Sequence, residues 1–387
     1  MSLFSSKPKS FLGVDLGAGG VKIVELRLEK KRPVLFTYGL TSASQDVHRL
    51  LAGAQLAPEN LKLEQKADIR AEKRAAPAVD ASDARVEEYA ATNRAVCRAA
   101  KTVSKTATGS LPVSAVFHSI VTMPKVDQKE FLGVLKAEVK KLLPYSIDDM
   151  VLDYQILESF STDKVKKIMI SAVPKSIVEF YSKVFRRAGL ILESLEPESA
   201  SLERSLIGRD TAVTMLIDMG AERTNFFIID QSVPITHHTI ESGGNKINKL
   251  LVNALGVGEA EVAQVKHDLF KRSLNASANP LNRETFTATL MPIIDPIVKQ
   301  IEYSFNLYLN QSGNEQKRPE KIVLTGGAAM VPYLADHLAD AFKIKCYLGD
   351  PWARTVYQDK LKPLLNEIGP RMSVCIGLAL KNLVSGV

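Results

Sequence analysis

The sequence has few of the features that mark a metal-binding, secreted or membrane-spanning protein. Only three cysteines occur in 387 residues, Cys97, Cys346 and Cys375, and their spacing fits neither a metal site nor a redox motif. No apolar run reaches the ~20 residues that span a bilayer. The start of the chain, MSLFSSKPKSF, lacks the apolar core of a secretory signal. We therefore expect reduced thiols in a cytosolic protein.

The chain also lacks a strong charge imbalance. Its 50 basic and 43 acidic residues give a formal charge of +7 at pH 7, which permits contact with anionic surfaces but does not indicate nucleic acid as a partner. Hydrophobic residues make up 45% and charged residues 24% of the sequence, as in an ordinary soluble globular protein. The length is enough for two or more domains, each with its own core.

A glycine-rich turn near the start directly follows an acidic residue. The stretch FLGVDLGAGGVK, residues 11–22, predicts two strands at 11–16 and 21–28 joined by a turn. An Asp at a strand end, beside bare backbone N–H groups, can hold Mg²⁺ through water while the turn binds phosphate oxygens. Taken alone, such a turn is more often ordinary turn chemistry.

The same layout returns in the second half of the chain. In AVTMLIDMGAERTNFFIID, residues 218–220 (DMG) repeat residues 15–17 (DLG) between two predicted strands, and such an internal repeat indicates a duplicated fold. Two glycine pairs follow, at 243–244 and 326–327. Because glycine lets backbone approach a ligand closely, the last pair suits a site beside an adenine ring or ribose.

A compact insertion is predicted between the two repeats. From Leu111 to Gly189 the pattern runs strand, helix, strand, strand, helix, which indicates one small α+β module. Residues 41–85 are rich in Ala and in charges of both signs, with almost no large apolar residue after Leu63, so we expect a mobile insertion or a loosely packed helix there. The tail SVCIGLALKNL predicts a short final helix that carries Gly377.

Together these motifs resemble a known family. The segments GVDLGAGGVK, LIDMGAERTNFFI, SGGNKIN, VLTGGAAMVPYL and SVCIGLAL are similar to the actin-like ATPase superfamily. The segments FHSIVTMPKVDQKEF, AEVKKLLPYSIDDMVLDYQIL and VPKSIVEFYSKVFRRAGL are similar to the module inserted in its FtsA/PilM branch. Over residues 8–40 and 86–387 the chain resembles the PilM family of type IV pilus assembly proteins. The resemblance implies an α/β, duplicated actin-like (ribonuclease-H-like) ATPase fold, with two lobes around a nucleotide cleft and an inserted small α+β module.

The resemblance also implies domain boundaries. Residues 1–110 would form the first half of lobe I, and 111–190 the inserted module, a candidate peptide-binding unit. The chain would return to lobe I at 191–211, form lobe II over 212–349 and end in lobe I at 350–387.

Position by position, the resemblance implies a site for ATP and Mg²⁺, with Asp15 and Asp218 holding the metal through water. The implied nucleotide-binding residues are Asp15, Gly17, Ala18, Gly19, Gly20 and Lys22 in the first loop, Asp218, Gly220, Ala221, Glu222, Arg223 and Thr224 in the second, Gly243, Gly244, Lys246, Asn248 and Lys249 near the ribose and base, and Gly326, Gly327 and Ala328 at the adenine pocket. Lys249 is equally well explained as a solvated helix-face lysine. Because the first loop has no Ser or Thr and Glu222 adds negative charge near a γ-phosphate, we expect weakened nucleotide binding and slow or no hydrolysis.

No catalytic residue follows from the sequence. Glu138 and Asp153 stand in no recognisable catalytic spacing, and we expect them to be surface acids. His118 lies in a strand of alternating apolar residues and is expected to be packed. The pair His237-His238 has no matching third ligand in the sequence, so we expect no metal site there.

The resemblance implies a scaffold that is cytoplasmic and peripheral to the inner membrane. Proteins of this family capture the cytoplasmic N-terminal peptide of PilN, a member of a PilN/PilO membrane complex, so contact with the membrane would be indirect. We expect the peptide in a groove beside the inserted module, with basic and apolar anchors. The residues expected there are Ala137, Lys140, Lys141, Leu143, Pro144 and Tyr145. Self-association stays open.

Two other functions stay open. An FtsA-like polymerising division ATPase would carry an amphipathic membrane helix at the C-terminus, and the ending NLVSGV does not resemble one. A small-molecule kinase of the actin fold would need an acidic base in the cleft and a substrate loop, and the sequence shows no clear version of either.

Overall fold

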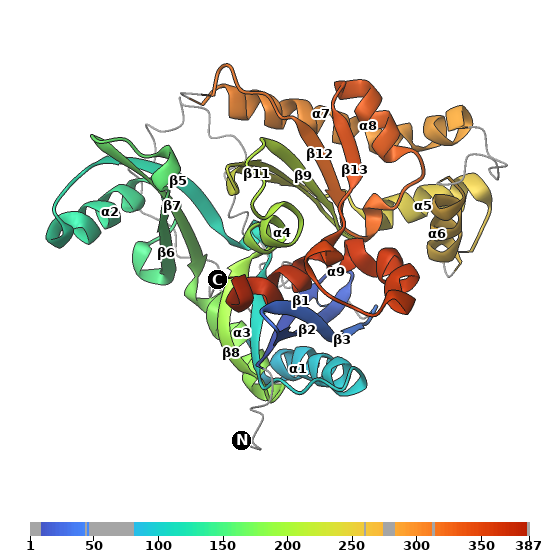
Figure 1. Cartoon of the computed structure of the whole chain (residues 1–387), viewed down its shortest axis with the longest axis horizontal. Coiled ribbons are helices and arrows are strands. Elements are labelled where there is room, and N and C mark those ends of the chain that lie inside the picture. Colours follow the sequence, from blue (N-terminus) through green and yellow to red (C-terminus); the bar gives the residue numbers. More distant parts are fainter. Residues whose placement is uncertain are drawn as a thin grey trace.

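The computed structural model describes residues 9–42, 45, 81–258, 261–273, 283–311 and 314–384. Two five-stranded sheets form two lobes, with lobe II above lobe I in the view of Figure 1 and a smaller three-stranded sheet at the left. The predicted mobile insertion at 41–85 lies almost entirely outside the described residues.

The sheet of lobe I has the order β3-β2-β1-β4-β8. Its strands are β1 (Ser10–Gly17), β2 (Gly20–Glu29), β3 (Arg32–Leu40), β4 (Thr106–Leu111) and β8 (Ile191–Pro197). The first three strands form an antiparallel meander, and β4 and β8 add in parallel. The turn from β1 to β2 closes through Gly20, whose φ of +105° is costly for any residue with a β-carbon. The predicted strand pair around the first glycine turn is confirmed.

The sheet of lobe II repeats this arrangement, with the order β11-β10-β9-β12-β13. Its strands are β9 (Thr214–Met219), β10 (Thr224–Asp230), β11 (Val233–Ile240), β12 (Lys321–Thr325) and β13 (Lys345–Leu348). Again the first three strands are antiparallel and the last two are parallel additions. Since order and direction agree strand for strand, the predicted duplication is confirmed.

Helices cover the outer face of each sheet. In lobe I, α1 (Asp83–Ala99) and α3 (Lys175–Arg187) pack on the apolar residues that point outward from β1 and β2. In lobe II, the outer face is covered by α5 (Gly244–Leu255), α7 (Arg283–Leu309) and α8 (Leu334–Phe342), with α6 (Val262–Ser273) beyond α5. Burial of these faces is the main stabilising contribution to each lobe.

The helices between the two sheets join the lobes. Helix α9 (Lys362–Val384) packs against the inner face of β1 and β2, and α4 (Glu198–Leu202) continues into a π-helical turn, Glu203–Ile207. Residues of both helices share one apolar cluster with the inner face of the lobe II sheet. Gly377 permits the close crossing, because a β-carbon there would lie 1.9 Å from the Ser201 carbonyl oxygen. The predicted short final helix is therefore the end of a longer one, which begins at Lys362 and continues through Pro370.

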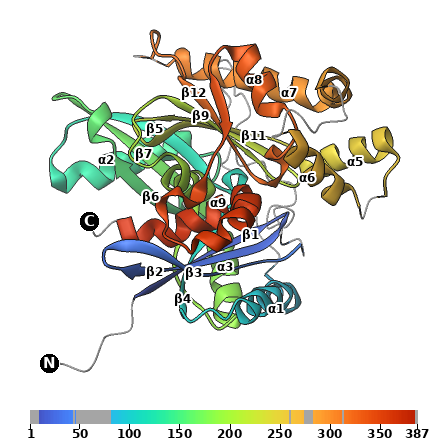
Figure 2. The same cartoon turned by 45° about the vertical axis from the view of Figure 1, so that its right-hand side comes forward.

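The three-stranded sheet has the order β5-β7-β6 and carries one helix. Its elements are β5 (Phe117–Pro124), α2 (Gln128–Leu142), β6 (Met150–Ile156) and β7 (Val165–Pro174), which share their own apolar cluster. This module projects from the side of the lobes (Figure 2). The sequence pattern predicts α3 as part of the module as well, but the buried face of α3 lies in the lobe I core, with Phe180 and Phe185 packed beside β1 and α1.

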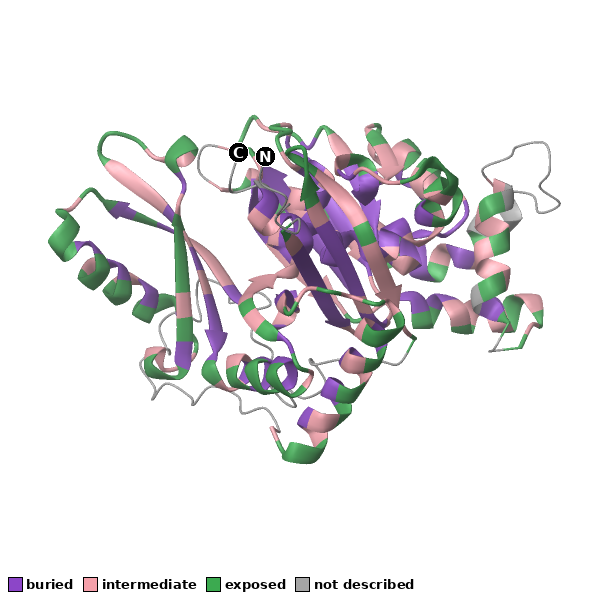
Figure 3. Cartoon of the chain, turned by 60° about the horizontal axis from the view of Figure 1, so that its bottom comes forward, coloured by how far each residue is buried: buried purple, intermediate pink, exposed green. Residues whose placement is uncertain are grey.

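Buried residues concentrate in the two large sheets and their facing helices, while the helix of the module is exposed over most of its length (Figure 3). Helix α2 buries only Phe131, Leu135 and Val139 against its sheet. The module is therefore a thin layer beside a thick two-lobed core. Within the described residues, no helix is both long and apolar enough to cross a bilayer.

Candidate functional site

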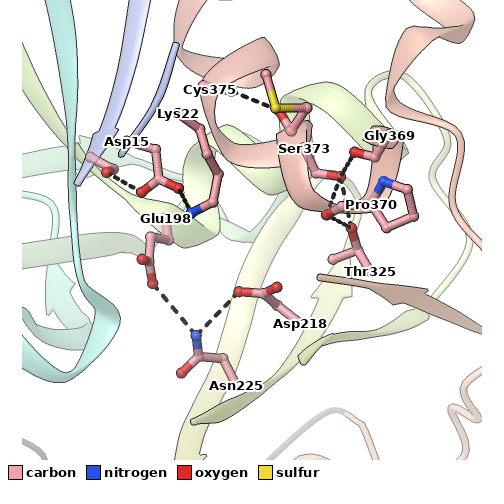
Figure 4. A network of polar contacts seen from close by, with 12 residues as sticks. Asp15, Lys22, Glu198, Asp218, Asn225, Thr325, Gly369, Pro370, Ser373 and Cys375 are labelled. Carbon is pink, nitrogen blue, oxygen red and sulfur yellow. Dashed lines mark hydrogen bonds and ion pairs between the residues drawn. The ribbon is translucent and has the colours of Figure 1, made fainter. Parts of the chain in front are cut away.

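The end of β1 places Asp15 in the cleft between the lobes, where the residue is 4% exposed. Its Oδ2 accepts a hydrogen bond from Lys22 Nζ at 2.8 Å, and its Oδ1 accepts one from Ser110 Oγ at 2.9 Å. Burial alone would lower the pKa of Lys22, but the Asp15 carboxylate outweighs it and the pKa is raised. Lys22 of β2, predicted to face phosphate, is thus engaged with the acid opposite it on β1 (Figure 4).

The second hairpin places an Asp–Asn pair where the first has Asp–Lys. Asp218 lies opposite Asn225 in the β9–β10 register, as Asp15 lies opposite Lys22. The Asn225 amide donates to Asp218 Oδ2 at 3.4 Å and to Glu198 Oε2 at 3.5 Å (Figure 4). Thr239 Oγ1 donates to Asn225 Oδ1 at 2.8 Å, which fixes the orientation of the amide. The second loop therefore connects to a third carboxyl group.

Glu198 is that third carboxyl group, and sequence reasoning missed it. It begins α4, directly after β8, and its Oε2 also accepts a hydrogen bond from the backbone N–H of Val113 at 3.3 Å. Burial and the negative charges of Asp15 and Asp218 raise the pKa of Glu198 to about 8. Burial and the Asp15 charge likewise raise the pKa of Asp218 to about 6. Burial is the larger cause of both shifts, and repulsion between the carboxyl groups adds to it.

The only sequence signal for Glu198 was its position as the first residue of a helix after a strand. The glycine repeats gave no indication of it, because it lies in the connection between the two lobes rather than in either repeat. A carboxyl whose pKa is moved by burial and by named charges in a cleft is typical of a functional site.

The two glycine loops face each other across a cavity of about 780 Å³. A β-carbon added to Gly19 would lie 3.5 Å from the β-carbon of Ala221, so the loops are nearly in contact. The predicted residues that line the cavity are Asp15, Gly17, Ala18, Gly19, Lys22, Asp218, Gly220, Ala221, Glu222, Arg223, Gly244, Asn248, Gly326, Gly327 and Ala328. The structure thus brings together residues from both repeats and from both glycine pairs.

The other predicted residues lie outside the lining, and most support the loops. Thr224 donates through Oγ1 to the Ser242 carbonyl, and Gly243 allows the α5 start to approach the second loop, since a β-carbon there would lie 2.7 Å from Ala221 backbone. Gly20 packs against Thr41. The remaining two are exposed on α5: Lys246, which donates to the Glu241 carbonyl, and Lys249.

The far end of the cavity is cationic, which the sequence did not reveal. Lys266 of α6 and Arg371 of α9 line it beside the 326–327 glycine pair, and a β-carbon on Gly327 would lie 3.1 Å from Arg371 Cγ. Burial, helped for Lys266 by the charge of Arg371, lowers the pKa of both groups. Lys266 Nζ donates to Asn248 Oδ1 at 2.9 Å. One end of the cleft is therefore acidic and the other basic.

The rim of the cationic end is bridged by an ion-pair cluster. Glu367 of α9 lies 2.8 Å from Lys271 Nζ and 3.2 Å from His267 Nε2, both of α6. His267 and Glu367 also line the cavity. The cluster therefore joins lobe II to the C-terminal helix at the mouth of the cleft.

The composition of the cleft fits a metal-bound nucleotide. Asp15, Asp218 and Glu198 bring three carboxyl groups together in one cleft, and hard divalent cations relieve such crowding through oxygen ligands or water. The glycine at 244 and those at 326–327 leave room for backbone to approach a ligand. The described residues hold no cluster of three or more His, Cys, Asp or Glu in the arrangement of a direct metal site, so water would complete the ligand set.

A second cavity of about 600 Å³ lies between the module and lobe I. Its walls include β6, the outer strand of the module sheet, and β8, the outer strand of the lobe I sheet. We call this cavity the edge groove. The six residues expected for peptide binding near the end of α2 are not among those that line it.

Histidines join the module to lobe II above the edge groove. The rings of His118 and His237 meet edge to face, with centroids 5.5 Å apart. Burial lowers the pKa of His118 to about 4 and that of His237 to about 3, so both rings are neutral at physiological pH. His118 is packed, as the sequence predicted, and in addition forms part of a contact between domains.

A duplicated α/β fold, with an acid at the end of the first strand of each repeat and a cleft between them, defines an actin-like ATPase fold. The chain belongs to the type IV pilus assembly protein PilM family, whose model matches residues 39–383. The resemblance found in the sequence is thereby confirmed.

Solved structures agree on the fold. The chain is similar to a protein of a structure described as the PilM-PilN type IV pilus biogenesis complex, with 20% identity, a TM-score of 0.72 and coverage of 97% of this chain and 99% of that one. It is also similar to the ethanolamine utilization protein EutJ from Carboxydothermus hydrogenoformans, with 13% identity, a TM-score of 0.51 and coverage of 97% and 91%. A comparison with the curated proteins finds no match.

Proposed function

We propose that this protein is a nucleotide-binding scaffold of the type IV pilus assembly machinery that associates with the inner membrane through a PilN-type membrane protein. Its membership of the PilM family and its actin-like fold support the assembly role. The same findings do not favour a polymerising division ATPase or a small-molecule kinase. The single observation that carries the nucleotide part is the group of three carboxyls that line one cavity beside two glycine loops.

The cleft is proposed to hold ATP with Mg²⁺. Asp15 and Asp218 would hold the Mg²⁺ ion through water. The ion would supply the positive charge that balances the carboxylates. The loops at 17–19 and 220–223 would contact the phosphates, and Lys266 and Arg371 would line the base end. Mg²⁺ at the acidic end would set the orientation of the nucleotide, because the ion would neutralise the carboxyls and attract the phosphates to that end.

Slow hydrolysis is the expected consequence of the same chemistry. A general base must accept a proton from the attacking water. Glu198 is the carboxyl in the cleft that most resembles such a base, but its Oε2 already accepts hydrogen bonds from the Val113 N–H and from the Asn225 amide, which leaves it less able to accept a proton from water. A bound nucleotide would therefore bridge the two lobes for a long time before it is hydrolysed.

The edge groove is the proposed site of the PilN-type peptide. Two sheet edges, β6 and β8, present backbone groups along its walls, and an extended peptide can pair with such an edge. Val151 and Tyr154 of β6 are exposed by 41% and 44%, and both line the groove. They would supply apolar contacts to alternate side chains of the peptide.

The test is the binding of the cytoplasmic N-terminal peptide of a PilN-type protein from the same organism to the full chain, measured by fluorescence anisotropy. We expect saturable binding at micromolar concentration. As a site control, Tyr154→Lys should weaken binding, whereas the same change at Leu132, an exposed residue of α2 outside the groove, should not. No binding by the unmodified protein at micromolar concentration would contradict the proposed partner.

A further inference from the structure

The edge groove is acidic in a protein that is basic overall. The lining residues that carry a formal charge at neutral pH are Asp153, Glu193, Glu196, Glu203, Arg204 and Lys381. Four acids against two bases leave a formal charge of −2, whereas the whole chain carries +7. The groove therefore has the opposite sign of charge to the molecule that contains it.

Both cations of the groove are engaged with the same acid. Glu196 accepts from Arg204 in a two-pronged pair at 2.9 and 3.1 Å, and from Lys381 at 3.1 Å. Arg204 also donates to the Gly377 carbonyl at 2.8 Å. Both cations that line the groove are thus paired with Glu196, and neither is paired with Glu203.

Glu203 lines the groove without a partner of its own. It begins the π-helical turn after α4, where the wider winding departs from an ordinary helix, a feature often found at functional sites. Across the residues that the structure describes, its carboxyl makes no hydrogen bond and no ion pair. Arg354 lies near enough to influence it, but the guanidinium of Arg354 donates to the Ile207 carbonyl at 2.7 Å. A half-buried carboxyl in this state is incompletely satisfied.

We propose that the edge groove selects an extended segment that carries a Lys or Arg side chain, and that Glu203 pairs with this cation. This inference rests on the proposed function, since the same groove is assigned to the peptide. The charge of the groove suits a cytoplasmic segment of a membrane protein, because such segments are enriched in Lys and Arg. An extended backbone fits because both walls are strand edges.

The charged groups around Glu203 give the pairing a pH dependence. Arg204 lies on the same turn, and Arg354 faces it from the 3-10 turn Pro351–Arg354. Glu196 faces it from β8 and is paired with Lys381 of α9. Burial outweighs the two arginines and raises the pKa of Glu203 to about 7. A cationic segment prefers the ionised carboxylate, so affinity falls as pH is lowered from 8 to 6. His118, also in the groove, stays neutral over this range.

The test uses the full chain and two N-acetylated peptides from the cytoplasmic N-terminus of the PilN-type protein, one native and one with citrulline or acetyl-lysine in place of each Arg or Lys. We expect Glu203→Gln to raise the Kd of the native peptide about 10- to 100-fold at pH 8, as for loss of a charged hydrogen bond. The neutral peptide should bind both proteins alike, and the pH dependence should vanish in the variant. Glu179→Gln, at an exposed position of α3 outside the groove, is the matched control.

Two further measurements separate the possible failures. Thermal unfolding of Glu203→Gln at pH 8 should match or exceed that of the unmodified protein, because the change removes an unpaired buried charge. Glu203→Lys should restore affinity for a peptide that carries Glu at the cationic position. If the unmodified protein binds neither peptide, the proposed function fails. If it binds both equally and Glu203→Gln changes nothing, the charge selection is wrong while the proposed partner stands.

Discussion

Replacing Glu198 by Gln should make the protein without nucleotide more stable at alkaline pH. The side chain is partly buried in the cleft, and this burial together with Asp15 and Asp218 raises its pKa from 4.5 to about 8. Between these two values the folded state keeps a proton that the unfolded state has released. The free energy of unfolding therefore falls as pH rises through this window, and the loss is complete above pH 8.

The size of the effect follows from the shift. Each unit of pKa difference corresponds to about 1.4 kcal/mol. Because pH 7 lies about 2.5 units above the pKa of 4.5 in the unfolded state and still below the pKa in the folded state, the free energy of unfolding is lower by about 3 kcal/mol at pH 7. Gln is neutral in both states and avoids this loss. Its amide oxygen can still accept from the Val113 N–H and its NH₂ group can donate to an aspartate, so the contacts that hold Glu198 are largely kept.

The assay is urea unfolding from pH 5 to pH 8.5, without nucleotide or Mg²⁺. The unmodified protein should lose stability as pH rises, and Glu198→Gln should lose less, with the two curves converging near pH 5. A residual slope near pH 6 is expected from Asp218, whose pKa is raised to about 6. Glu179→Gln is the control for an exposed carboxyl and should follow the unmodified protein. The reasoning is refuted if Glu198→Gln is no more stable at pH 8 and shows the unchanged slope.

Two other changes test the rim and the helix crossing. Glu367→Gln should raise the dissociation rate of a fluorescent ATP analogue severalfold in stopped-flow experiments, because it removes the carboxylate that holds His267 and Lys271 at the mouth of the cleft; an unchanged rate would show that the cluster does not retain nucleotide. Gly377→Ala should lower the free energy of unfolding by at least 1–3 kcal/mol, roughly the cost of overpacking, because the new β-carbon would lie 1.9 Å from the Ser201 carbonyl oxygen. An unaltered urea midpoint would contradict the close packing of α4 on α9.

The sequence predicted the two repeats because the chemistry of each is local. In both, a run of apolar residues ends at an Asp, one residue precedes a glycine, and a second strand follows. Strand pairing across so short a turn is decided by neighbouring residues, so the register that sets Asp15 opposite Lys22 and Asp218 opposite Asn225 follows from the pattern.

What the sequence could not supply depends on contacts between distant segments. Glu198 lies between the repeats and becomes part of the cleft only when α4 crosses α9. Lys266 and Arg371 are far apart in the chain, and nothing in their local sequence brings them to one cavity. Helix α3 follows the module in sequence, but its strongly apolar face is buried only by packing against α1 and β1. The edge groove likewise depends on which strands end up at the edges of two separate sheets.

The central claim is that the cleft between the repeats holds a metal-bound nucleotide, and isothermal titration of the protein with ATP and Mg²⁺ tests it most directly. The account predicts binding at one site, a loss of affinity of about tenfold or more in Asp218→Asn, as expected when a charged contact is removed, and unchanged affinity in Lys249→Ala, because Lys249 is exposed outside the cavity lining. Equal heats for all three proteins would contradict it.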